Sequence, residues 1–183
     1  MLYLKKANFE DMEKEYVFMR DMPEDENGMG NVWHGVSRAD FENIALPKML
    51  ANEKGEDLKP GYVPQTNYFL WEDGEILGVY HFRHYLNDAL REGSGHIGCY
   101  IAPQYRGKGY GSRGLALMID KAFESIPEDE VCLRVFKYNT PSLRAMLRCG
   151  GYIHHEDEEH YFVRVRRPEK CPAGVDTNGK DCI

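Results

Sequence analysis

The sequence predicts a single α/β domain in which four helices flank a mixed, mostly antiparallel sheet of about seven strands. Segments of strand-like and helix-like periodicity follow one another in the order strand, two helices, three strands, helix, strand, helix and two strands. A chain of 183 residues, 42% of them hydrophobic, can bury one core of ordinary size. We therefore expect one domain over residues 1–167 and a loose tail over 168–183, where apolar periodicity ends.

The first expected elements are a strand and two helices. Residues 2–7 have the pattern of a short strand, and a helix follows whose expected cap is Asn8. Residues 23–35 are acidic and rich in glycine, which predicts a loop. Ser37 or Asp40 is expected to cap the second helix, because both side chains can accept hydrogen bonds from a first helical turn.

A hairpin is expected next, over residues 67–86. Asp73 and Gly74 stand between two apolar runs, which is a strong signal for a tight hairpin turn. Residues 95–103 then form a third strand of this group. The elements that follow the central helix are expected at residues 130–138 (strand), 140–149 (helix) and 151–167 (hairpin).

The composition argues against several classes of protein. The N-terminus soon turns polar, and no apolar run approaches the roughly 18 residues of a membrane helix, so we expect a cytoplasmic protein that does not enter a membrane. Five cysteines without CxxC pairs do not suggest a disulfide framework, and Cys171 and Cys182 are expected to stay reduced. The net charge of −7 and a pI near 5.5 disfavour nucleic acid as a partner and are compatible with a cationic small substrate.

Residues 104–123 combine a glycine-rich turn with a strongly periodic helix. The helix has an apolar stripe, and glycine occupies four of the eight positions from 107 to 114. The first N–H groups of a helix are unpaired, its dipole end is positive, and glycine lets a ligand approach the backbone closely. With three basic residues around it, this turn predicts a phosphate-binding site.

Two kinds of phosphate ligand are compatible with such a turn. The segment GYGSRG matches the GxGxxG pattern of a dinucleotide site, which would make the protein an oxidoreductase. Such a site requires an acidic residue about 20 positions further on, at the end of the next strand, to hold the ribose. That strand ends here in Phe136, Lys137 and Tyr138, so the dinucleotide is the weaker alternative.

The segment RGKGYG fits a second pattern better. It matches Gln/Arg-x-x-Gly-x-Gly/Ala with Arg106, Gly109 and Gly111 at the specified places. Its surroundings, HIGCYIAPQYRGKGYGSRGLALMI and NTPSLRAMLRCGGY, resemble the strand, turn and long helix, and then the following helix, of the GCN5-related N-acetyltransferases (GNAT). The expected order of elements is also that of the family, so the resemblance covers about residues 1–167.

This resemblance implies acetyl-CoA as co-substrate, bound at the glycine-rich turn. The turn residues that would hold the pyrophosphate are Arg106, Gly107, Lys108, Gly109, Tyr110, Gly111 and Ser112. The backbone of Cys99 and Ile101 would pair with the pantetheine arm, and Asn139 and Ser142 would lie against the cofactor. No metal is expected, and we interpret the histidine- and acid-rich residues 154–160 as a solvated hairpin turn.

Acetyl transfer to an amine also requires a proton acceptor, and the tetrahedral oxyanion must be stabilised. The first candidate for the base is His96, on the strand that would hold the cofactor. The lesser candidates are Glu72, His81 and His84. A backbone N–H of the cofactor strand would stabilise the oxyanion, and this role needs no particular side chain.

The acid position departs from the family pattern. Many members have a tyrosine where this chain has Met146, so Tyr138 is the candidate acid, unless the thiolate leaves without help. We predict an N-acetyltransferase that acetylates a primary amine of a small molecule or peptide directly, as a monomer or a homodimer. The alternative is a catalytically weak acyl-CoA-binding or regulatory domain. The sequence does not identify the acceptor.

Overall fold

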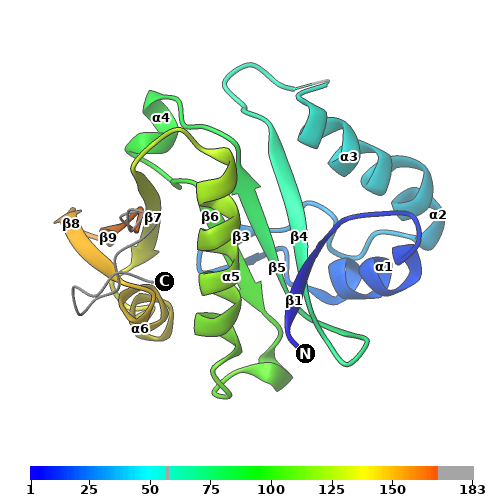
Figure 1. The fold of residues 1–183 in the computed structure, drawn as a ribbon. Coiled ribbons are helices and arrows are strands. Elements are labelled where there is room, and N and C mark those ends of the chain that lie inside the picture. The colour runs from blue at the N-terminus through cyan, green and yellow to red at the C-terminus, as the bar shows by residue number, and fades with distance from the viewer. Residues whose placement is uncertain (57, 169–183) are drawn as a thin grey trace, which may run out of the picture.

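An antiparallel sheet with the strand order β1-β4-β5-β6 forms the centre of the molecule (Figure 1). Its strands are β1 (Tyr3–Lys6), β4 (Gln65–Glu72), β5 (Glu75–Arg83) and β6 (Ile97–Ile101). The β4–β5 hairpin turns at Asp73 and Gly74 with φ of 50° and 80°, as the Asp-Gly pair predicts. The computed structural model describes residues 1–56 and 58–168, so the predicted tail from residue 169 on, with its two cysteines, lies outside the described residues.

A second antiparallel sheet lies beyond β6. Its order is β7-β9-β8, with β7 (Glu130–Phe136), β8 (Gly151–Glu156) and β9 (His160–Arg166). In the described part of the chain the ladder between the two sheets is an isolated bridge from Gly95 to Leu133, and β6 and β7 diverge from there. These seven strands confirm the predicted sheet. Their antiparallel pairing differs from the parallel sheet that the dinucleotide alternative requires.

Helices cover both faces of the central sheet (Figure 1). Two of them, α1 (Met12–Asp21) and α3 (Leu46–Lys54), pack on one face, and α5 (Tyr110–Ser125) packs on the other. Next to α5, α6 (Thr140–Arg148) covers the second sheet. The shorter segments are α2 (Arg38–Asp40), a π-helical turn (Phe41–Ala45), α4 (Asp88–Arg91) and a 3-10 turn (Pro103–Tyr105). None of the helices among the described residues has both the length and the apolar character that a membrane span requires.

Of the predicted helix caps, the structure contradicts the first and decides between the two candidates for the second. The Asn8 cap is wrong, because α1 begins at Met12 and the Asn8 side chain accepts the N–H of Asp11 (2.9 Å) in the turn before the helix. Ser37, one of the two candidates for the second helix, does cap it, and its hydroxyl accepts the N–H of Asp40 at 3.1 Å.

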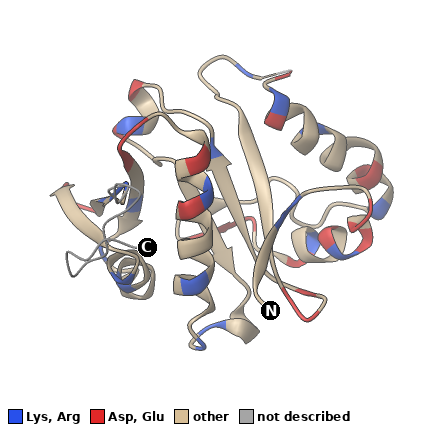
Figure 2. Ribbon diagram, in the orientation of Figure 1, with Lys and Arg blue, Asp and Glu red and all other residues tan. Residues whose placement is uncertain are grey.

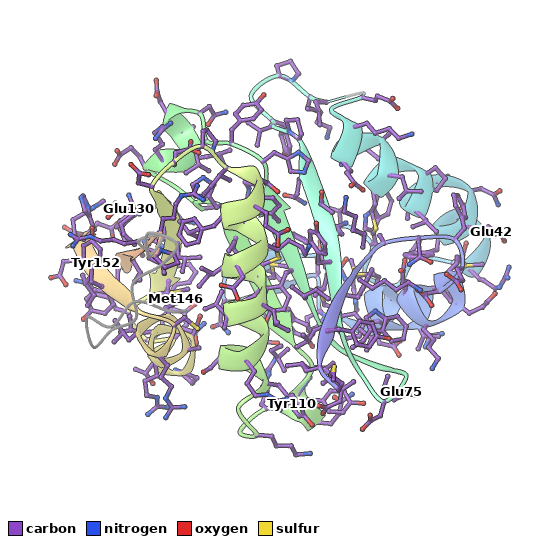
Figure 3. The ribbon with its side chains drawn as sticks, in the orientation of Figure 1. Glu42, Glu75, Tyr110, Glu130, Met146 and Tyr152 are labelled. Carbon is purple, nitrogen blue, oxygen red and sulfur yellow. The ribbon has the colours of Figure 1, made fainter. Side chains whose placement is uncertain are left out.

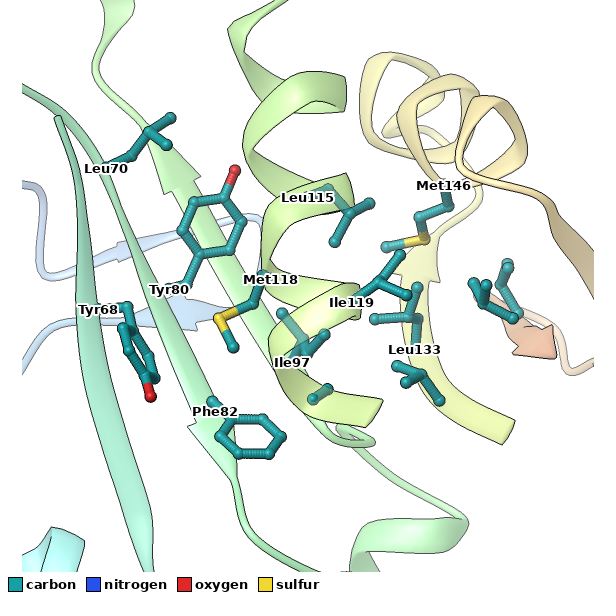
Figure 4. Packing of buried hydrophobic residues seen from close by; sticks show 14 of the residues in the cluster. Tyr68, Leu70, Tyr80, Phe82, Ile97, Leu115, Met118, Ile119, Leu133 and Met146 are labelled. Carbon is teal, nitrogen blue, oxygen red and sulfur yellow. The ribbon is translucent and has the colours of Figure 1, made fainter. Parts of the chain in front are cut away.

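The apolar stripe of α5 packs on β5 and on the second sheet (Figure 4). Leu115, Met118 and Ile119 are at most 5% exposed, and the ring of Tyr80 lies beside them. At Gly114 the helix comes closest to the sheet, since a Cβ there would lie 2.4 Å from the Tyr80 hydroxyl. Gly114 therefore allows the helix to pack closely on the sheet. The glycine pattern in the sequence does not distinguish this role from ligand binding.

Glu15 of α1 is a fully buried carboxyl group that makes stability depend on pH. Its oxygens accept the N–H of Asn8 at 3.1 and 3.3 Å, and burial raises its pKa from 4.5 to about 8. Because the folded protein holds this proton more tightly than the unfolded chain, the contribution to stability is complete below about pH 4.5 and is lost as the pH rises toward about 8.

We therefore expect the free energy of unfolding to fall between about pH 5 and pH 8, by up to about 1.4 kcal/mol per pH unit from this one group. Glu15→Gln keeps an acceptor oxygen without a titrating proton, so its stability should fall less over the same range. Urea denaturation at several pH values measures both slopes. Equal slopes in the two proteins would contradict the prediction.

Candidate active site

The divergence of β6 and β7 opens a cavity of about 810 Å³. Its wall is formed by these strands, the start of α5 and one face of α6. Nine of the eleven residues predicted to hold the cofactor lie in this wall: Cys99, Ile101, Arg106, Gly107, Gly109, Gly111, Ser112, Asn139 and Ser142. The fold thus brings three separate segments of the chain around one volume.

The glycine-rich turn places the start of α5 at one end of the cavity. Gly107 and Gly109 have φ of 75° and 81°, in the left-handed region, and a Cβ at either position would meet no atom within 4 Å. The backbone N–H of Arg113 donates to the Gly109 carbonyl (3.1 Å) and is the first to bond within the helix. The backbone N–H groups of the residues before Arg113 in the first turn therefore have no partner within the helix. Open space, unpaired N–H groups and the positive end of the helix dipole fit a pyrophosphate group.

The other two predicted turn residues lie outside the cavity wall. Lys108 donates to the carbonyl of Gln104 at 3.1 Å. Tyr110, labelled at the lower end of α5 in Figure 3, donates its hydroxyl to Glu72 at 2.5 Å. Arg113 pairs with the same carboxylate at 3.5 Å, so Glu72, a lesser candidate for the base, is held outside the cavity.

One edge of β6 is available to an extended ligand. The other edge pairs with β5, which bonds the carbonyl of His96 (2.8 Å) and the N–H of Ala102 (3.0 Å). Because backbone groups alternate in direction along a strand, those of Cys99 and Ile101 point away from β5, toward the cavity. The Ile101 carbonyl accepts Arg106 Nε at 2.8 Å, which leaves the Cys99 groups and the Ile101 N–H for a ligand.

The Cys99 side chain packs against the α5 side of β6. Burial raises the pKa of its thiol from 9.0 to about 11, so the thiol is neutral near pH 7 and a poor nucleophile. We expect Cys99→Ala to keep most of the activity, because the backbone groups remain, and we expect no acetyl adduct on the parent in intact-protein mass spectrometry. A stable adduct that disappears in Cys99→Ala together with turnover would establish a covalent route.

The start of α6 forms the wall opposite β6. Asn139 begins this helix by accepting the N–H of Ser142 at 3.3 Å, and both residues line the cavity. Arg144 and Arg148 follow on the same side of the helix. Met146, at the family's usual acid position, is 4% exposed and packs between α5 and α6 (Figure 4), a core role that its apolar neighbours in the sequence already favour.

The two residues predicted for catalysis do not line the cavity. His96 is fully buried, its ring Nδ1 accepts the backbone N–H of Cys132 at 3.0 Å, and the backbone N–H of His96 donates to the Cys132 carbonyl at 2.7 Å. Burial lowers the pKa of His96 to about 4, so the ring stays neutral. Tyr138 is 67% exposed and stacks on Phe136 with ring centroids 5.0 Å apart. His96 joins the two sheets, and Tyr138 lies on the surface.

Of the remaining histidines named from the sequence, His81 lies in the cavity wall. Its Nε2 is buried without a hydrogen-bond partner among the described residues, and it sits opposite Gly98 in the β5–β6 ladder. Burial, and next the charge of Arg83, lower its pKa to about 4. His84 bonds Thr66 Oγ1 at 2.8 Å, outside the wall.

A second histidine of the wall is not among the predicted residues. His160 begins β9 opposite Phe136, and its Nδ1 lies 3.2 Å from a carboxylate oxygen of Asp157. Its Nε2 is buried, again without a partner in the described residues. The alternation of His160 with Phe162 is the signal that places it in the strand rather than in the turn predicted at 154–160. Within residues 1–56 and 58–168, no group of three or more His, Cys, Asp or Glu is placed to hold a metal ion.

The segment predicted as a loop, residues 23–35, contains a short hairpin that lines the cavity. It consists of β2 (Asp25–Glu26) and β3 (Met29–Gly30). Its contacts with the wall are Glu26 with Arg106 (2.7 Å), Gly28 with the ring of Phe136, and Met29 with Gly98. Strands of two residues have no measurable periodicity, so the sequence does not reveal them.

Comparisons with known proteins agree with this geometry. Residues 36–151 match the acetyltransferase (GNAT) family, and no curated protein sequence matches the chain. Similar solved structures include the N-acetyltransferase PseH of Campylobacter jejuni in complex with acetyl coenzyme A (21% identity, 91% of this chain and 99% of that chain, TM-score 0.58). The ribosomal-protein-S5-alanine acetyltransferase from Vibrio fischeri (15%, 93% and 96%, 0.66) and yncA from Salmonella typhimurium with acetyl-CoA (15%, 94% and 97%, 0.62) share the fold as well. Since the family match covers more than half of its residues, the chain belongs to the GNAT acetyltransferase family.

Proposed function

We propose that the protein is an acetyl-CoA-dependent N-acetyltransferase that transfers the acetyl group directly to a primary amine. The observation on which this proposal rests is one cavity that combines the first turn of α5, the free edge of β6 and a buried histidine. Two of the similar structures contain acetyl-CoA, which supports the same co-substrate here.

Acetyl-CoA would supply the acetyl group, and two parts of this chain would hold it. The unpaired N–H groups at the start of α5 suit the pyrophosphate. The outward backbone groups of Cys99 and Ile101 suit the amides of the pantetheine arm, as an added strand would. A free N–H on this edge also stabilises the oxyanion that develops when the amine attacks.

The proton of the attacking ammonium group must pass to a base. Burial lowers the pKa of His81 and of His96 to about 4, which disfavours the uptake of a proton by either ring. His160 differs because the carboxylate of Asp157 faces its Nδ1 and stabilises the imidazolium as it forms. We therefore assign the proton acceptor to Nε2 of His160, and a structural role to His96.

No side chain is required as the acid in this mechanism. Met146 has no proton to donate, and Tyr138 lies outside the cavity wall, so neither residue can protonate the leaving sulfur there. An ordinary thiol has a pKa of about 8.5, so a thiolate leaves without much help near neutral pH.

The absence of Tyr138 from the wall is also the observation that supports the second candidate, a catalytically weak acyl-CoA-binding or regulatory domain. The deciding experiment measures the release of free CoA thiol from acetyl-CoA with polyamines, aminoglycosides, amino acids and peptides with free N-termini. Turnover with any of these amines supports the transferase. Acetyl-CoA binding without turnover across the panel favours the regulatory domain, and absence of binding overturns both.

A further inference from the structure

Four arginine side chains in the cavity wall have no acidic partner within 4.0 Å among residues 1–56 and 58–168. Arg144 and Arg148 belong to α6, beside the proposed cofactor site, and the other two belong to strands. Arg83 ends β5, and Arg134 lies in the middle of β7. Arg83 donates from Nη1 to the Gly95 carbonyl at 3.1 Å, which holds its guanidinium group at the junction of the two sheets. The two positive charges therefore face the cavity from two different sheets.

The rest of the wall does not neutralise this charge. Glu26 is the acidic residue of the described wall, and it is paired with Arg106 at 2.7 Å. Burial lowers the pKa of Arg83, and the positive charge of Arg134 lowers it further, so the two guanidinium groups influence each other. Although the whole chain has a net charge of −7, its acidic residues lie mainly on the helices and connecting turns (Figure 2).

The pair lies at the end of the cavity away from the glycine-rich turn. The backbone N–H of Arg83 donates to the His96 carbonyl just before β6 begins. The glycine-rich turn follows the other end of β6, roughly 13 Å away at about 3.3 Å per residue. His81, with its unpartnered Nε2, precedes Arg83 by two residues on the same face of β5. The arginine pair is therefore too far from the start of α5 to bind the pyrophosphate.

We propose that Arg83 and Arg134 bind an oxyanion of the acceptor, so that the substrate class is an amine that also has a carboxylate or phosphate group. This inference rests on the proposed acetyl transfer. An oxyanion between two guanidinium groups offsets their mutual repulsion and receives charge-assisted, often bidentate hydrogen bonds. The same wall repels purely cationic amines, in contrast to the cationic substrate that the net charge of the chain allows.

Amines that differ in the oxyanion alone provide the test: lysine with cadaverine, tyrosine with tyramine, and phosphoethanolamine with ethanolamine. The two readouts are kcat/KM for acetyl transfer and the thermal stabilisation of the protein by each amine in the presence of CoA. We expect the oxyanion-bearing member of at least one pair to be favoured about tenfold or more. Arg83→Met and Arg134→Met should each lower its use by about 10- to 100-fold, the usual loss for a charge-assisted contact, and Arg134→Lys should lose less.

Arg166→Met is the matched control, because this arginine of β9 is exposed, pairs with Glu130 at 3.4 Å and lies outside the wall. It should leave the oxyanion preference unchanged. Turnover without such a preference, or a preference that survives both Arg→Met changes, would overturn the subsite and leave acetyl transfer standing. A third outcome is that oxyanion-bearing amines stabilise the parent but not the Arg→Met variants, and that no amine is turned over. This outcome would support the subsite and count against acetyl transfer. Absence of both stabilisation and turnover for every pair would also overturn the subsite.

Discussion

Gly109→Asp is expected to weaken acetyl-CoA binding about 100-fold or more while the fold stays intact. Gly109 directly precedes α5 with φ of 81°, and a Cβ there would meet no atom within 4 Å. The new carboxylate would therefore occupy the space beside the first-turn N–H groups, where the pyrophosphate is proposed to bind. Two negative charges about 4 Å apart repel by about 4 kcal/mol at an effective dielectric constant of about 20. Calorimetric titration of both proteins with acetyl-CoA measures the loss.

Asparagine at the same position separates charge from shape. Asp and Asn both tolerate the left-handed backbone better than most residues, and both are favourable at a helix start, so neither change should unfold α5. We expect Gly109→Asn to bind acetyl-CoA about 100-fold more tightly than Gly109→Asp, since it adds the same bulk without the charge. A Gly109→Asp protein with the circular dichroism of the parent and the affinity of the parent would show that the cofactor site lies elsewhere.

The main elements of the fold could be predicted because their signals are local. The Asp73–Gly74 turn specifies its hairpin within a few residues, and the apolar stripe of α5 is visible in one stretch of sequence. Elements of two to four residues, such as β2, β3 and α4, are too short for a period. The cap of α1 could not be assigned, because Asn8 and Asp11 both precede the helix as possible acceptors.

The two ends of the cavity also differ in how local their sequence signals are. The cofactor end depends on a contiguous glycine-rich turn and could be proposed from the sequence. The acceptor end depends on which residues of β5, β7 and β9 share a face, and pairings between distant strands decide that, such as Arg134 opposite Phe162. Nothing near His96 in the sequence indicates that its ring bonds Cys132, 36 residues further on.

His160→Ala is expected to lower kcat by roughly two to four orders of magnitude while acetyl-CoA affinity stays close to that of the parent. The Nε2 atom of His160 is buried in the cavity wall, without a partner among the described residues, and Asp157 lies 3.2 Å from its Nδ1. The change removes the proposed proton acceptor but leaves the start of α5 untouched, so kcat and binding should separate. Steady-state kinetics and calorimetry with acetyl-CoA measure the two effects.

Asp157→Asn tests the same assignment through a positioning residue. Its carboxylate accepts the N–H groups of Glu159 and His160 at 2.8 and 2.6 Å, and an amide oxygen can keep these contacts while the charge that stabilises the imidazolium is lost. We expect an intermediate loss of kcat. His96→Ala is the contrasting variant, because losing the contact with Cys132 should lower thermal stability and leave kcat of the folded protein near that of the parent.

Chemical rescue distinguishes a missing base from a disturbed strand in His160→Ala. Added imidazole can take the proton in place of the lost ring, and an acceptor amine of lower pKa needs less help to lose it. If the defect is the missing base, either change should restore part of the turnover of His160→Ala and have little effect on the parent, which keeps its base. Neither change repairs a strand that has moved, so a structural defect would not be rescued. Near-parental kcat in folded His160→Ala would remove this residue from the mechanism. The other unpartnered histidine of the wall, His81, would then become the candidate, although it would have to act from a pKa of about 4.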